Sequence, residues 1–148
     1  MNPAISSLQK AEKEVIVNFS LDQVKASVML MFKKFPGKYI LRENDINEVF
    51  NTYHFPISNN LNPAIVDMVL TEVDAGKTKI SISVTNAYGS LSSNSILAGI
   101  ANDYLLVLGK VLSGESIESV KQSVKSSGCL VIMVIGMVSL ALMSFILL

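Results

Sequence analysis

Residues 64–85 read AIVDMVLTEV-DAGK-TKISISVT, and this stretch decides the fold. Between Ile80 and Val84 the apolar residues stand at every second position, with serine between them. Such alternation is typical of a strand that has one face in the core and the other in water. Asp-Ala-Gly-Lys in the middle favours a tight turn, so the stretch predicts an antiparallel hairpin of strands 64–73 and 78–85. A strand with one wet face belongs to a sheet that is covered on one side only.

Before this hairpin, the sequence predicts a strand and then a helix. Residues 14–19 alternate like a strand, and Ser20 with Gln23 three residues later forms a capping box, which is a start signal for a helix. Pro36-Gly37 ends the helical run. The apolar stripe of this helix is Leu21, Val24, Val28, Met31 and Phe35.

Two more strands and a second helix complete the pattern. A short strand is expected over residues 38–43, and a longer one, rich in aromatic residues, over residues 47–57. After the hairpin, apolar residues recur at helical spacing between residues 96 and 112, and Asn102 and Asp103 fall on the opposite face. The apolar face of this second helix is Ile96, Leu97, Ile100, Tyr104, Leu108, Val111 and Leu112.

This order of elements predicts an α+β fold over residues 14–112: an antiparallel sheet of about five strands with two helices on one face (β-α-β-β-β-β-α). Residues 1–13 are expected to be a disordered lead, and residues 113–128 a polar juxtamembrane linker, part of which can form a helix. The order resembles the helix-grip or TBP-like arrangement, of which START and Bet v 1-like lipid-binding domains are larger relatives. That resemblance rests on element order, and it implies an apolar cavity between the sheet and the last helix.

The last twenty residues, 129–148, predict a transmembrane helix. They contain no charged residue, and twelve of them are Leu, Ile, Val or Phe. A helix of this length spans about 30 Å, the thickness of the hydrocarbon core, and twelve such side chains favour insertion by about 4–7 kcal/mol. The alternative is a buried helix of a globular fold. Because Lys121 and Lys125 precede the helix and no signal peptide is recognisable, we expect a tail-anchored, single-pass membrane protein with its N-terminal domain in the cytoplasm.

Charge and cysteine content argue against several classes of function. Twelve basic and twelve acidic residues give a net charge of zero, so no basic surface is expected to bind nucleic acid. The one cysteine, Cys129, cannot form an internal disulfide, and at the membrane boundary it is chemically able to carry a palmitoyl group. Neither a metal-ligand spacing nor a cofactor loop is recognisable, so we expect no metal and no cofactor.

Three local motifs suggest a chemical role, but for each of them a structural role is the simpler interpretation. Gly76-Lys77-Thr78 looks like the end of a phosphate-binding loop, but position 71 is threonine instead of the first glycine, and a strand instead of a helix follows. His54, the only histidine, lies in an expected strand without metal-ligand neighbours. We therefore expect no catalytic residues. The densest acidic group, which is expected to be a solvated turn, consists of Glu43, Asp45 and Glu48.

Three functions remain, and we rank them. The first is a membrane-tethered interaction or adaptor domain with an unknown protein partner and no catalytic activity. The second is a binder of a lipid or other apolar ligand in a cavity between the sheet and the last helix. There the small residues Ala98, Gly99, Ala101 and Gly109 either leave room for a ligand or let the helix approach the sheet closely. An enzyme is third. The expected ligand-binding residues are Met68, Leu70, Ile82, Ile100, Tyr104 and Leu108.

Overall fold

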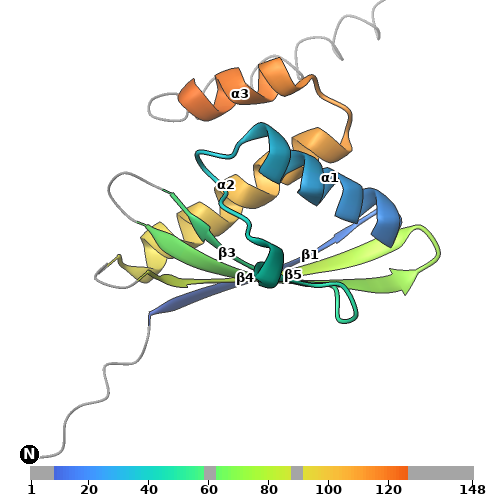
Figure 1. The fold of residues 1–148 in the computed structure, drawn as a ribbon, viewed down its shortest axis with the longest axis horizontal. Helices are drawn as coiled ribbons and strands as arrows, with labels where there is room; N and C mark the ends of the chain where they lie inside the picture. Colours follow the sequence, from blue (N-terminus) through green and yellow to red (C-terminus); the bar gives the residue numbers. More distant parts are fainter. Residues whose placement is uncertain (1–8, 59–62, 88–91, 127–148) are drawn as a thin grey trace, which may run out of the picture. The chain divides into compact units, whose positions relative to one another are not determined.

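The structure, a computed structural model, describes residues 9–58, 63–87 and 92–126. The chain divides into two compact units, residues 1–114 and residues 115–148. The first unit contains the sheet and two helices (Figure 1). The described part of the second unit holds one helix, α3 (Ile117–Ser126), so a helix does form within the predicted linker. The predicted membrane span, residues 129–148, lies outside the described residues.

The first unit begins with a strand and a helix, continues through four strands and ends with a second helix. Its elements are β1 (Lys10–Val17), α1 (Leu21–Lys34), the 3-10 turn η1 (Glu43–Asp45), β2 (Ile46–Asn47), β3 (Thr52–Ile57), β4 (Ala64–Asp74), β5 (Lys77–Asn86) and α2 (Asn94–Leu112).

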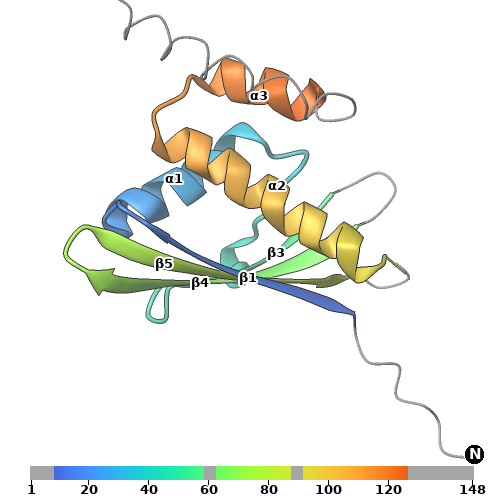
Figure 2. The ribbon, with the colours of Figure 1, turned by 180° about the vertical axis from the view of Figure 1, so that it is seen from behind.

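The strands form one antiparallel sheet in the order β1-β5-β4-β3-β2. The hairpin of β4 and β5 supplies its centre, with Leu70 opposite Ile80 and Met68 opposite Ile82. Both α1 and α2 lie on the same side of this sheet (Figures 1 and 2). The predicted α+β class, with about five antiparallel strands and two helices on one face, is therefore confirmed.

The capping box predicted for the first helix is present. The Ser20 hydroxyl accepts a hydrogen bond from the Gln23 backbone N–H at 3.3 Å, and Gln23 Oε1 accepts one from the Ser20 N–H at 2.9 Å. These bonds satisfy two amides that have no partner within the helix. The helix then buries Val24, Val28, Met31 and Phe32.

Two strand boundaries differ from those predicted. Residues 38–43 do not form a strand; instead Tyr39 makes one isolated bridge to Ile57. The single strand expected over residues 47–57 is broken by a turn, because the Asn47 side chain accepts hydrogen bonds from the Val49 and Phe50 N–H groups at 3.1 and 3.2 Å. Asn51 follows in the left-handed region (φ 51°), which asparagine tolerates better than most residues. The sequence therefore keeps its predicted number of strands but divides them differently.

Strand β1 begins earlier than predicted, at Lys10 instead of residue 14. Its whole length pairs with β5, from Lys10 opposite Thr85 to Val17 opposite Thr78. Its first residues are polar apart from the buried Ala11, so they carry no apolar alternation that would mark a strand. The predicted inward face, with Val15 and Val17, is the correct one.

Among the described residues, α2 is the one helix long and apolar enough to cross a membrane by length and composition. In the fold it lies over β1 and β5 and also contacts α1. Ala101, Tyr104 and Leu108 are buried on one side, whereas Asn102 and Asp103 are exposed on the other. That pattern belongs to a helix that covers a sheet.

Candidate ligand-binding site

The six residues predicted to face a ligand all lie in the interior between the sheet and α2. Met68 on β4 and Ile82 on β5 are direct cross-strand partners, and Leu70 stands two positions along β4. From the other side, the helix directs Tyr104 into this layer. Every one of the six is at most 7% exposed, so a ligand reaches them only when interior side chains move. Their role in binding stays a prediction.

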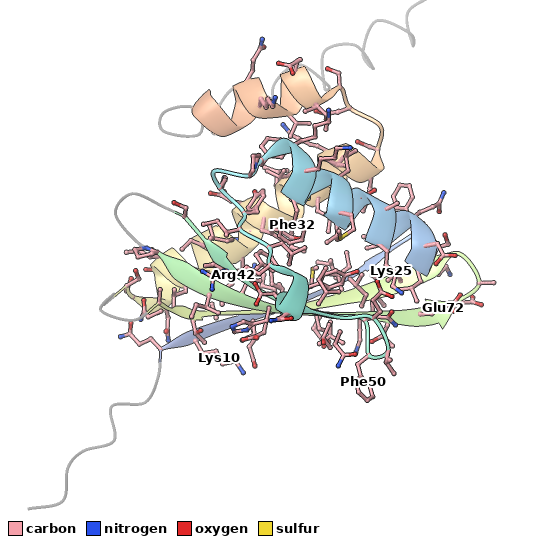
Figure 3. The ribbon with its side chains drawn as sticks, in the orientation of Figure 1. Lys10, Lys25, Phe32, Arg42, Phe50 and Glu72 are labelled. Carbon is pink, nitrogen blue, oxygen red and sulfur yellow. The ribbon has the colours of Figure 1, made fainter. Side chains whose placement is uncertain are left out.

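Tyr104 is the centre of an aromatic cluster, which consists of Tyr104, Tyr39, Phe55, Phe32 and Phe35. Its ring lies 5.3 Å from that of Tyr39, nearly perpendicular, and 5.3 Å from that of Phe55. Phe32 of α1 meets the edge of Phe55 at 4.8 Å, and Phe35 contacts Tyr39 at 6.1 Å. The cluster therefore joins α1, β3, α2 and the connection over residues 35–39 in the interior. Figure 3 shows Phe32 between the helices and the sheet. Offset and edge-to-face rings of this kind are preferred over face-to-face stacking.

Two hydroxyls in this cluster lack a hydrogen-bond partner within the described part of the chain. They belong to Tyr39 and Tyr104, each 1% exposed. A third buried hydroxyl without a partner, that of Ser83, lies on a β5 position that alternates with the core residues, so it faces the opposite side of the sheet. An unsatisfied buried hydroxyl costs about 1–3 kcal/mol, which makes two in one apolar cluster unusual.

Both tyrosines are protonated at neutral pH, and burial disfavours their deprotonation further. It raises the pKa of the Tyr104 hydroxyl well above the ordinary value of 10.0, and neighbouring tyrosines add to the effect. Burial also raises the pKa of Tyr39, and the negative charge of Asp103 raises it by a smaller amount. Both side chains can therefore donate a hydrogen bond at neutral pH. The interior therefore offers two hydroxyls that can donate a hydrogen bond and have no partner among the described residues.

Lys38 lies at the edge of the cluster. Its backbone is fixed beside β3, because its carbonyl accepts a hydrogen bond from the Ser58 N–H at 2.9 Å. The Lys38 Nζ atom lies 5.5 Å from the centre of the Tyr39 ring. Burial lowers the pKa of this half-buried ammonium, and the negative charge of Asp103 raises it in part. No ion pair joins Lys38 to a carboxylate of the described residues.

Of the four small residues of α2 that were expected to face the sheet, the two glycines do not. Gly99 and Gly109 are exposed, and a Cβ atom at either position would meet nothing within 4 Å. They neither open a cavity against the sheet nor let the helix approach it. Ala101 is fully buried and Ala98 half-buried, so Ala101 is the small side chain that faces the interior.

The motifs that looked chemical have structural explanations. Gly76 lies in the tight turn between β4 and β5 with φ 79°, a conformation that glycine adopts without strain. His54 is exposed on the uncovered face of the sheet, where its Nδ1 atom lies 2.6 Å from Oδ1 of Asp67. Asp45 accepts a hydrogen bond from the Arg42 N–H at 3.0 Å, which closes η1. In the part of the chain that the structure describes, no cluster of His, Cys, Asp or Glu is able to hold a metal ion.

Sequence reasoning missed Tyr39, Phe55 and Lys38 as members of the site. The sequence predicts Phe55 as part of an aromatic strand, but its position under α2 depends on strand order. The sequence predicts Tyr39 in a strand over residues 38–43, which does not form. One signal was available, since a lysine and a tyrosine directly after Pro36-Gly37 are an unusual composition for a connection between elements.

Comparison with known proteins adds information on the fold. No protein-family model and no curated protein matches the chain. Among solved structures 17 chains match. One of them, described as "Crystal structure of Ara h 8.0201", has a TM-score of 0.50 at 16% identity, and the match covers 76% of this chain and 99% of that one. The fold is helix-grip-like. This confirms the helix-grip part of the predicted resemblance and leaves the TBP-like part without support.

Proposed function

We propose that the domain binds an apolar ligand that carries a hydrogen-bond acceptor, in the interior between the sheet and α2. The observation that carries this proposal is the pair of buried tyrosine hydroxyls, those of Tyr39 and Tyr104, which find no partner among the described residues and lie in an otherwise apolar cluster. A ligand with an accepting oxygen would satisfy both donors while its apolar body keeps the surroundings dry. The helix-grip-like fold is compatible with this use, since it places a long helix across one face of a sheet.

The interior must open to admit a ligand, and its composition favours such a change. Met31 of α1 and Met68 of β4 are both fully buried next to the layer that α2 covers. Methionine has an unbranched, flexible side chain that repacks around different shapes more easily than leucine or valine. We expect these two side chains to move when a ligand enters, while the aromatic cluster stays in place.

The remaining parts of the proposal concern the setting of the domain. Residues 129–148 would hold the chain in a membrane, with the sheet domain in the cytoplasm. Binding would not be accompanied by catalysis. Tethering places the domain close to a reservoir of apolar molecules, which fits a ligand drawn from the bilayer.

The test compares ligands retained by two forms of the full chain. Wild type and the double variant Tyr39→Phe/Tyr104→Phe are purified in the same detergent, extracted with organic solvent and analysed by mass spectrometry. The double variant differs from the wild type by only two oxygen atoms, so the amount of bulk lipid that co-purifies should be the same for both. We expect one compound with an accepting oxygen to be enriched in the wild type. The proposal would be refuted if wild type and double variant retained the same compounds and the wild type held none of them in a stoichiometric amount.

A second candidate function is supported by the uncovered face of the sheet. Ile16 of β1 and Val69 of β4 are 61% and 38% exposed there, and Phe50 at the tip of the β2–β3 turn is 69% exposed. In Figure 3 Phe50 projects away from the helices. Exposed aromatic and aliphatic side chains of this kind are common in protein interfaces. An adaptor that uses this face would lose partners in a cross-linking pull-down of Phe50→Ser, whereas a ligand binder would retain its ligand.

A further inference from the structure

The geometry around Lys38 points to a more specific class of ligand: we propose that it is a single-chain amphiphile whose oxyanion head group lies between Lys38 and the hydroxyls of Tyr39 and Tyr104, while its apolar chain packs in the interior between the sheet and α2. This inference rests on the proposed binding function and adds the identity of the head group. Carboxylate and phosphate share the chemistry that Lys38 would recognise.

The first step in the argument is the position of the ammonium group. Lys38 follows the connection after α1 and is held beside β3 by the Ser58 N–H to Lys38 carbonyl bond, 2.9 Å, and by the Ile40 N–H to Pro56 carbonyl bond, 3.2 Å. The next residue, Tyr39, points inward and is 1% exposed. Lys38 therefore stands where the interior meets solvent, next to the residue that carries one of the two hydroxyls without a partner.

The second step is that this ammonium lacks an anion. Lysine side chains that are not needed elsewhere extend into water, because desolvation of the charge is costly. Lys38 instead packs its Nζ atom 5.5 Å from the centre of the Tyr39 ring and is half-buried. Lys10, Lys79 and Lys121 each pair with a glutamate within 4.0 Å, whereas Lys38 pairs with no carboxylate of the described residues.

The third step concerns Asp103, the acidic residue whose charge acts on Lys38. It lies on the exposed face of α2, one residue before Tyr104, and acts on both Lys38 and Tyr39 through its charge without forming an ion pair. A negative head group at Lys38 would feel the same charge as a repulsion. Asp103 should therefore weaken binding of an oxyanion and leave binding of a neutral alcohol unchanged, which provides an independent test.

The test uses the full chain in a non-ionic amphipol and three probes with the same tail: decanoate, decyl phosphate and decan-1-ol. Affinities are measured by isothermal titration calorimetry at neutral pH. A hydrogen bond to a charged group predicts that at least one of the two anions binds wild type about tenfold more tightly than the alcohol. Lys38→Met should abolish that preference and leave the affinity for decan-1-ol unchanged. The matched control, Lys34→Met at an exposed position of α1, should behave like wild type.

The outcomes separate this inference from the function on which it rests. If the alcohol and both anions bind equally well, or if Lys38→Met keeps the preference, the head-group inference is wrong and the binding function stands. If none of the three probes binds, the binding function itself fails. Asp103→Asn should strengthen anion binding about threefold, and this arm remains informative if Lys38→Met does not fold. A preference for decanoate over decyl phosphate, or the reverse, identifies which oxyanion the site takes.

Discussion

Tyr104→Phe tests the reasoning at the centre of the site, because it removes one oxygen atom from a fully buried ring. The hydroxyl of Tyr104 has no hydrogen-bond partner among the described residues, and an unsatisfied buried hydroxyl costs about 1–3 kcal/mol. The substitution also leaves a small void and loses a few contacts of the oxygen atom, which offsets about 1 kcal/mol of that gain. We expect the free energy of unfolding to rise by up to about 2 kcal/mol in the ligand-free protein.

Thermal unfolding of the full chain in amphipol, followed by circular dichroism, measures this change. For a domain of this size, 1 kcal/mol corresponds to about 4–8 °C in Tm. Tyr53→Phe is the matched control, since Tyr53 is also buried in the sheet but its hydroxyl is not among those without a partner. The control should change by less than about 0.5 kcal/mol. If Tyr104→Phe instead lowers stability by more than about 1 kcal/mol, the hydroxyl makes an interaction, such as one with a buried water, and the reasoning is refuted.

Three further predictions concern the helix face, pH and the tail. Gly99→Ala should stabilise the domain by about 0.5–1 kcal/mol in urea unfolding, because the new Cβ meets nothing and alanine favours a helix; a loss of stability would show that the face is occupied. The raised pKa values of Tyr39 and Tyr104 imply that the unfolded state gives up protons first. Stability should therefore be fully retained below about pH 10 and fall above it, less steeply in Tyr104→Phe, as pH-dependent unfolding will show. Alkaline carbonate should leave the full chain in the membrane pellet and release a chain ending at Gly128; release of both would contradict the anchor.

Local patterns in the sequence predicted the elements whose structure depends on neighbours in the chain. The capping box at Ser20 and Gln23 and the alternation between Ile80 and Val84 both involve residues a few positions apart, and both are confirmed. The division of residues 47–57 was missed because it depends on one side chain. Asn47 bonds two amides of the following turn, and asparagine occurs as readily inside an irregular strand as in such a turn.

The candidate site was predictable only where local periodicity places its residues, and not where a contact between distant segments does. Met68, Leu70 and Ile82 follow from alternation in a hairpin, and Tyr104 follows from helical spacing, so each could be assigned to the interior. Tyr39 reaches the same place only because residues 38–40 attach to the end of β3, a contact between distant segments that no periodicity records. That its hydroxyl has no partner in the described part of the chain is likewise a property of the packed interior.

The central claim, that a ligand in the interior accepts hydrogen bonds from Tyr39 and Tyr104, is tested most directly by NMR of the full chain labelled with ¹³C at tyrosine Cζ. Resonances are assigned with the single Tyr→Phe variants, and decan-1-ol and decanoate are titrated in turn. We predict that the Cζ signals of Tyr39 and Tyr104 shift in a saturable way while that of Tyr53 stays in place. Signals of Tyr39 and Tyr104 that do not move when the ligand is bound would contradict the claim.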